Sequence, residues 1–221
     1  MDIQSHTEIA YKKIKEAILK HEIIPGERLS LEDLALRSRI NETSVREALS
    51  RLTQEGYFIR RANDEYCVSE MSADEVIELF DLRQMLESYC VDEAIRRLTP
   101  DGLEALEQSV KFSHKSVVKN RPLADRYIIN KDFHLALAQM AGNSAVYRVL
   151  ADTCDKLVFT RPIDAVSHGG FAVLRFHRDI VRAIKQQDRN KAQELMKSHL
   201  DEIKYTLLKQ IALRTRMARA R

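Results

Sequence analysis

Hydrophobic residues recur every three or four positions along most of the chain, which is the spacing that one buried face of an α-helix requires. Turn-forming residues interrupt this pattern and divide it into helices of ordinary length. In the N-terminal part we expect helices over residues 7–21, 31–38 and 42–55. Ser30 and Asn41 can cap the second and third helices through their side-chain oxygens.

Two short runs of β-prone residues follow the third helix, at residues 57–59 and 66–68. The stretch between them, Arg60 to Glu65, is polar, so the three segments together predict a β-hairpin. Three short helices followed by a hairpin are typical of a winged helix-turn-helix. We therefore predict a DNA-binding domain of this kind over residues 1–70.

From Ser72 onward the helical spacing continues without another strand pattern. Six helices are expected, over residues 72–98, 100–119, 122–141, 144–160, 171–187 and 189–212. The fold class is therefore mainly α, with an all-helical bundle over residues 71–212. Residues 213–221 form a basic tail, which we interpret either as a frayed helix end or as an accessory contact for DNA phosphate.

Composition excludes several classes of protein. No apolar run approaches the roughly 20 residues that span a bilayer. The N-terminus also lacks the basic-then-apolar layout of a signal peptide. We therefore expect a cytoplasmic protein with no membrane partner. The cysteines, Cys67, Cys90 and Cys154, are far apart and indicate neither a disulfide framework nor a cysteine zinc site.

Net charge gives no support to DNA binding. The chain carries +3 overall, but residues 1–70 contain 11 basic and 13 acidic side chains, which is a net charge of −2. The basic footprint of many DNA-binding domains is therefore absent. The case for DNA must rest on the placement of individual residues.

The third predicted helix separates an apolar face from a polar one. Its polar face carries Glu42, Thr43, Arg46 and Ser50 in the N-terminal half, the positions from which a recognition helix reaches base edges. Arg46 can bind guanine with two hydrogen bonds, Thr43 a base or phosphate, and Glu42 the amino group of cytosine. The alternative is a solvated amphipathic helix with incidental charges.

Arg60 and Arg61, at the base of the predicted wing, suit phosphate contacts.

Short motifs in this region occur in a recognisable order. They are Ile24-Pro25-Gly26 with Leu29, then Leu34-Ala35, then Val45-Arg46-Glu47-Ala48-Leu49 with Leu52, and finally Glu55-Gly56. This arrangement resembles the N-terminal domain of GntR-type regulators. Two positions depart from the family pattern: Glu42 stands where arginine is common, and the wing tip, residues 62–65, has acidic residues where glycine is common. An acidic tip is repelled by a phosphate-lined minor groove.

Three histidines occupy unusual places in the C-terminal part. His134, His177 and His199 each lie on the apolar face of a separate predicted helix. A single buried histidine is more often a core residue with a hydrogen-bonded partner than a metal ligand. Burying several without partners costs about 1–3 kcal/mol each, and one divalent ion satisfies all of them together.

Arg83 is a further anomaly, because it lies on the apolar face of the helix predicted over residues 72–98. A guanidinium in this position needs an anion. That anion is either Glu87, one turn later, or a bound carboxylate, and the two can compete for the arginine.

The C-terminal motifs are Leu82-Arg83, Leu86-Glu87, Phe133-His134, Phe176-His177 and His199-Leu200. They resemble the FCD-type effector domain of the FadR subgroup of GntR regulators. The resemblance implies a divalent metal ion (zinc, nickel or manganese) bound by Asn130, His134, His177 and His199. It also implies a homodimer and a small organic acid effector near Arg83 and Glu87. Asn130 stands where aspartate is more usual.

The sequence therefore favours a ligand-responsive bacterial transcriptional regulator, acting as a repressor or an activator on operator DNA, and not an enzyme. One alternative is a metal-dependent enzyme that uses the same histidines, although the chain has no HExxH-like motif. A second is a constitutive DNA-binding factor with a purely structural metal ion.

Overall fold

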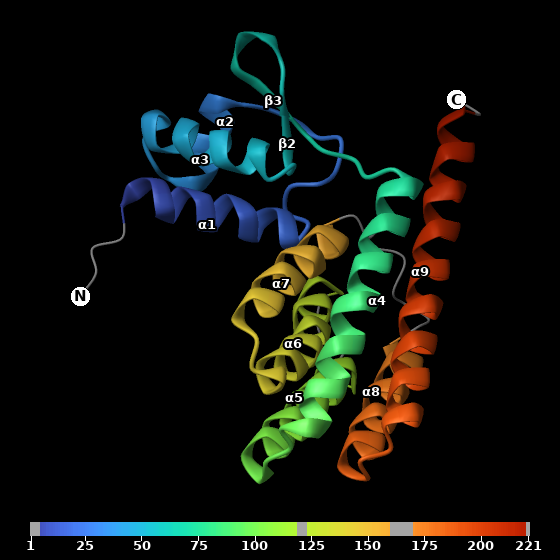
Figure 1. Ribbon diagram of the computed structural model, residues 1–221. Helices are drawn as coiled ribbons and strands as arrows, with labels where there is room; N and C mark the ends of the chain where they lie inside the picture. Colours follow the sequence, from blue (N-terminus) through green and yellow to red (C-terminus); the bar gives the residue numbers. More distant parts are fainter. Residues whose placement is uncertain (1–4, 119–122, 160–169, 220–221) are drawn as a thin grey trace. The chain divides into compact units, whose positions relative to one another are not determined.

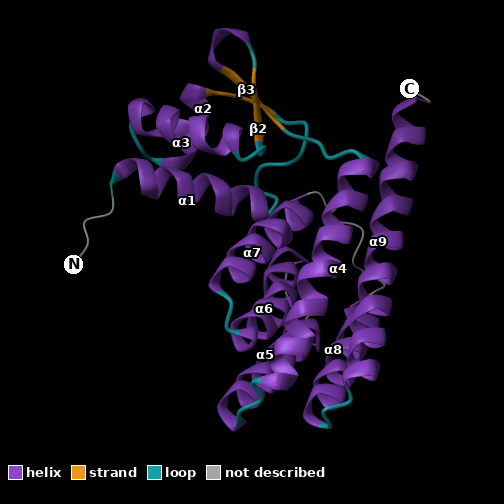
Figure 2. Cartoon of the chain, in the orientation of Figure 1, coloured by secondary structure: helices purple, strands orange, loops and turns teal. Residues whose placement is uncertain are grey.

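The computed structural model of the chain describes residues 5–118, 123–159 and 170–219 (Figure 1). The chain divides into two compact units between Met71 and Ser72. The N-terminal unit combines short helices with a small sheet, whereas the described part of the C-terminal unit contains helices and no strand (Figure 2).

The N-terminal unit combines helices with a small three-stranded antiparallel sheet. The helices are α1 (His6–Leu19), α2 (Leu31–Ser38), α3 (Glu42–Gln54) and a short 3₁₀ turn, η1 (Ala62–Asp64). The strands are β1 (Arg28–Ser30), β2 (Phe58–Arg60) and β3 (Glu65–Val68), in the order β1-β3-β2. The winged helix-turn-helix predicted from the sequence is confirmed.

The wing has one strand more than the predicted hairpin. β1 pairs Leu29 with Tyr66 of β3. With three residues, it is too short for a period-two pattern to be visible in the sequence. Its last residue, Ser30, also caps α2: the Ser30 hydroxyl accepts a hydrogen bond from the backbone N–H of Asp33 at 3.0 Å.

Helix α3 is held by a fully buried apolar face, which consists of Val45, Ala48, Leu49 and Leu52. Helix α1 packs against α3. At the edge of this contact the Thr7 hydroxyl donates to Glu47 at 2.6 Å, and the Arg51 guanidinium lies 3.7 Å from the ring centroid of Tyr11. This packing leaves the opposite face of α3 exposed.

The C-terminal unit is a helical bundle. Its helices are α4 (Ala73–Arg96), α5 (Pro100–Val118), α6 (Leu123–Ala141), α7 (Ser144–Phe159), α8 (Gly170–Lys185) and α9 (Arg189–Arg219). Helix α4 is central, because it packs against α6, α7, α8 and α9. The all-helical class predicted for this region is confirmed. No helix in the described residues combines the length and the hydrophobicity needed to cross a membrane.

Helix α9 runs further than predicted, to Arg219 rather than to about residue 212. The additional residues are leucine, arginine, methionine, alanine and threonine, without glycine or proline, so nothing in the sequence stops the helix there. A contact between this basic segment and DNA stays a prediction.

Candidate functional site

The three histidines singled out from the sequence lie together inside the helical bundle. His134 comes from α6, His177 from α8 and His199 from α9, and each side chain is at most 1% exposed. The Nε2 atom of His199 lies 3.1 Å from Nε2 of His177 and 3.4 Å from Nε2 of His134. One nitrogen from each ring thus faces a common point.

These distances fit a shared metal ion. Zinc–imidazole bonds are about 2.0–2.1 Å long, and ligand–metal–ligand angles of about 90–110° place neighbouring nitrogens about 2.9–3.4 Å apart. The ligand nitrogens of the three histidines all lie within 4.8 Å of one another. The cluster can therefore hold a divalent ion that accepts imidazole ligands.

Glu87, on α4, positions one of the three rings. Its Oε2 atom lies 2.5 Å from Nδ1 of His134, and its Oε1 atom accepts a hydrogen bond from Nε of Arg83 at 2.6 Å. Burial alone raises the pKa of the Glu87 carboxyl, but Arg83 and His134 outweigh burial and lower that pKa to about 2. The carboxylate is therefore ionised, so Nδ1 of His134 must be the donor and Nε2 faces the other two rings.

His177 has the protonation state that metal binding requires. Complete burial, together with the neighbouring His134 and Arg83, lowers the pKa of its imidazole well below the usual range. The ring is therefore neutral near pH 7, and it presents Nε2 to the cluster.

Phe133 fixes the orientation of His177, a role that the sequence analysis missed. The two rings stack with centroids 3.9 Å apart and an interplanar angle of 16°. Phe133 is fully buried. The repeated Phe-His dipeptide, at residues 133–134 and 176–177, was the available signal.

Two further residues predicted for this site are Arg83 and Asn130. Arg83 is buried and forms the expected ion pair with Glu87, and no acceptor among the described residues lies within hydrogen-bonding distance of its Nη2 atom. Asn130 belongs to α6, one turn before His134, but its side chain lies outside the described residues.

The predicted DNA-reading residues are exposed on the N-terminal unit. Glu42, Thr43, Arg46 and Ser50 lie on the open face of α3, and Arg60 and Arg61 lie at the end of β2 and directly after it. Arg46 and Arg60 share one partner that the sequence analysis did not identify, the carboxylate of Asp64 in the wing, at 2.7 and 2.8 Å.

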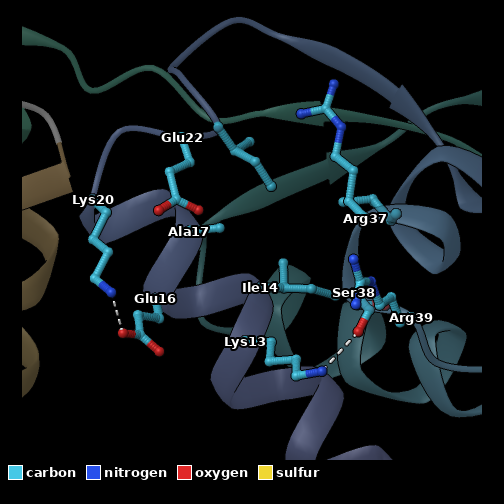
Figure 3. A pocket seen from close by; sticks show the side chains of 11 residues that line it. Lys13, Ile14, Glu16, Ala17, Lys20, Glu22, Arg37, Ser38 and Arg39 are labelled. Carbon is cyan, nitrogen blue, oxygen red and sulfur yellow. Dashed lines mark hydrogen bonds and ion pairs between the residues drawn. The ribbon is translucent and has the colours of Figure 1, made fainter.

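A pocket of about 590 Å³ lies between α1 and α2 (Figure 3). Its charged lining residues are Lys13, Glu16, Lys20, Glu22, Arg37 and Arg39. Lys13 donates to the backbone carbonyl of Ser38 at 2.9 Å, and Lys20 pairs with Glu16. Because these lysines already have partners and the histidines belong to the other unit, this pocket is not part of the histidine site.

Two known protein families match the chain, one over each of its units. The family described as "Bacterial regulatory proteins, gntR family" matches residues 6–78, and the family described as "FCD domain" matches residues 78–202. This chain belongs to the GntR family and carries an FCD domain.

Relatives of this GntR-family regulator are transcription factors. The Nta operon transcriptional regulator of Aminobacter aminovorans is 26% identical over 188 residues, which cover 81% of this chain and 85% of the relative. The transcriptional repressor NanR of Escherichia coli is 25% identical over 222 residues, covering 90% and 83%. The solved structure of E. coli McbR/YncC shares the fold, with a TM-score of 0.81, 20% identity, and coverage of 94% and 99%.

The GntR-family regulator therefore binds DNA and controls transcription, and it is not an enzyme. The hypothesis of a metal-dependent enzyme is wrong, because the family matches and the relatives are those of transcriptional regulators.

Glu87→Gln should destabilise the regulator by about 3–5 kcal/mol, because it leaves the buried Arg83 guanidinium without its counter-charge. The free energy of unfolding is measured on the full chain at pH 7, by urea denaturation followed with circular dichroism. Glu78→Gln is the control, since Glu78 is exposed on the same helix and its loss should change stability by less than about 0.5 kcal/mol. Equal stability of the two variants would contradict the role of Glu87.

Proposed function

We propose that this GntR-family regulator is a repressor that binds its operator as a homodimer and senses a small organic acid beside a divalent metal ion. The observation that carries the proposal is the convergence of the Nε2 atoms of His134, His177 and His199, with Glu87 fixing the first ring. Burying three imidazoles side by side is costly unless their facing nitrogens share a ligand, and a divalent ion is such a ligand.

The proposed metal ligands are His134, His177 and His199. Asn130, one turn before His134 on α6, is the proposed oxygen ligand. Zinc, nickel and manganese are the candidate ions, since each accepts imidazole nitrogen. When bound, the ion supplies a positive charge that attracts a carboxylate in the interior of the bundle.

Arg83 is the second proposed contact for the acid. Its Nη2 atom is a buried donor without an acceptor among the described residues, and a carboxylate oxygen is the ligand that best satisfies such a donor. Glu87 takes part indirectly: both of its oxygens are engaged, by Arg83 and by His134. An acid on Nη2 shares the guanidinium with Glu87, which holds Nε, and so weakens the Arg83–Glu87 ion pair; this weakening is how we propose that binding perturbs α4.

For operator binding we propose that α3 reads bases in the major groove through Glu42, Thr43, Arg46 and Ser50. Arg60 and Arg61 contact phosphate, and the basic residues at positions 213–221 are accessory phosphate contacts. Two copies of the chain would read two half-sites, so we expect the operator to be palindromic. Relatives named as repressors, RspR and NanR of E. coli, support repression as the mode of control.

Joint replacement of His134 and His177 by alanine should abolish metal binding, because one remaining imidazole cannot hold the ion. Zinc content is measured by elemental analysis after incubation with zinc and gel filtration. His6→Ala is the control, since His6 is exposed at the start of α1. A zinc-induced rise in melting temperature should accompany binding in the unmodified chain and in the control only. Undiminished zinc content in the double variant would refute the site.

Arg46→Ala should weaken specific operator binding by about 1–3 kcal/mol, because it removes a bidentate contact to a base. The assay is fluorescence anisotropy on a duplex that the unmodified chain selects from a random-sequence library. Arg51→Ala removes the same charge from the same helix, but Arg51 lies in the last turn of α3, away from the N-terminal half proposed to read bases, so this variant should retain most of the affinity. Unchanged affinity of Arg46→Ala would count against base reading by α3.

The sensing proposal predicts that at least one small carboxylic acid changes operator affinity about fivefold or more when zinc is present, which is the lower end of ordinary allosteric coupling. The assay repeats the anisotropy measurement with mono- and dicarboxylic acids of increasing length, with zinc and after its removal by a chelator. If no acid alters affinity while the protein retains zinc, the chain is a constitutive DNA-binding factor with a structural ion.

A further inference from the structure

The wing places an acidic side chain against the arginines proposed to meet DNA. Asp64 lies between α3 and the end of β2, where its Oδ2 atom accepts from Nη1 of Arg46 at 2.7 Å and its Oδ1 atom accepts from Nη2 of Arg60 at 2.8 Å. Arg46 is 46% exposed and Arg60 59% exposed, so both guanidinium groups also face solvent.

The backbone of the wing turn accounts for the residues found there. Asn63 and Asp64 have φ angles of 57° and 53°, in the left-handed region. Asparagine and aspartate enter this region more readily than other non-glycine residues. The turn therefore forms without glycine, and the second position adds a carboxylate to the wing.

The Asp64 carboxylate opposes the binding of a phosphate by Arg46 or Arg60 more than it opposes the binding of a base edge. A DNA phosphate that approaches Arg46 or Arg60 must also approach Asp64, and the two anions repel each other. Asp64 uses only the Nη1 group of Arg46, so within the described residues the Nε–Nη2 edge is left for the O6 and N7 acceptors of guanine. Guanine carries no net charge, so Asp64 penalises it less than phosphate.

Because the N-terminal region is acidic overall, the ion pairs of Asp64 with Arg46 and Arg60 have a large influence on its attraction to DNA. Residues 1–70 carry a net charge of −2, so sequence-independent attraction to DNA depends on a few local arginines. Two of them share the countercharge of Asp64.

We propose that Asp64 is a selectivity residue: by neutralising Arg46 and Arg60, it weakens binding to arbitrary DNA more than it weakens binding to the operator. This inference rests on the proposed reading of bases by α3. The acidic wing tip thus has two effects: it repels the DNA backbone, and it also neutralises the arginines that would contact DNA.

The test compares the full chain with its Asp64→Asn variant on two duplexes, the library-selected operator and a scrambled duplex of the same composition. Affinity for the scrambled duplex should rise about fivefold, and the slope of log affinity against log salt should steepen by about one to two, because released arginines gain phosphate contacts. Operator affinity should rise less than about twofold, so the ratio of specific to non-specific affinity falls.

Glu65→Gln is the matched control. It removes the same charge from the neighbouring residue, which forms no ion pair with another described residue. Adding Asp64→Asn to a variant with both Arg46→Ala and Arg60→Ala tests whether Asp64 acts through these arginines, because the effect on the scrambled duplex should then disappear. Circular dichroism checks that each variant folds.

Several results would overturn the inference. Equal changes on both duplexes, or equal effects of Asp64→Asn and Glu65→Gln, would mean that only total charge matters. Weaker operator binding by Asp64→Asn would make Asp64 a support for Arg46 instead. If Arg46→Ala itself leaves operator binding unchanged, the proposed function of α3 fails, and that result is distinct from a failure of Asp64 alone.

Discussion

The histidine cluster depends on the buried carboxylate of Glu87. Three ionisable groups, Arg83, Glu87 and His134, lie together in the interior of the bundle, each at most 2% exposed. Charges at such depth are tolerated only when each is paired. Glu87 meets this requirement with one oxygen on the guanidinium and the other on the imidazole. Glu87 therefore neutralises the positive charge of Arg83 on the same helix. By accepting from Nδ1 of His134, it also leaves Nε2 of that ring to face the other two histidines.

The same arrangement explains how a site inside the bundle can influence the helices around it. Helix α4 contributes Arg83 and Glu87, while α6, α8 and α9 contribute one histidine each. The acid proposed to bind Arg83 would therefore act next to the carboxylate that orients His134. Helix α4 is also the first helix of the C-terminal unit, so it follows the winged unit directly along the chain.

The sequence revealed those parts of the molecule that repeat with a regular period. The histidines were found because each lies on the apolar face of its own helix, and the recognition helix because its polar and apolar faces separate cleanly. Contacts between distant segments leave no such pattern. The bond between Glu87 and His134 spans 47 residues, the pairing of Asp64 with Arg46 spans 18, and β1 is too short to alternate. The place of Asn130 in the site stays a prediction.

The central claim is that His134, His177 and His199 bind one metal ion through nitrogen. X-ray absorption spectroscopy at the zinc edge, on the zinc-loaded full chain, tests it most directly. The account predicts a first shell of nitrogen and oxygen at about 2.0–2.1 Å, with the outer-shell scattering of three imidazole rings. A shell of sulfur at about 2.3 Å, or a spectrum without imidazole scattering, would contradict it.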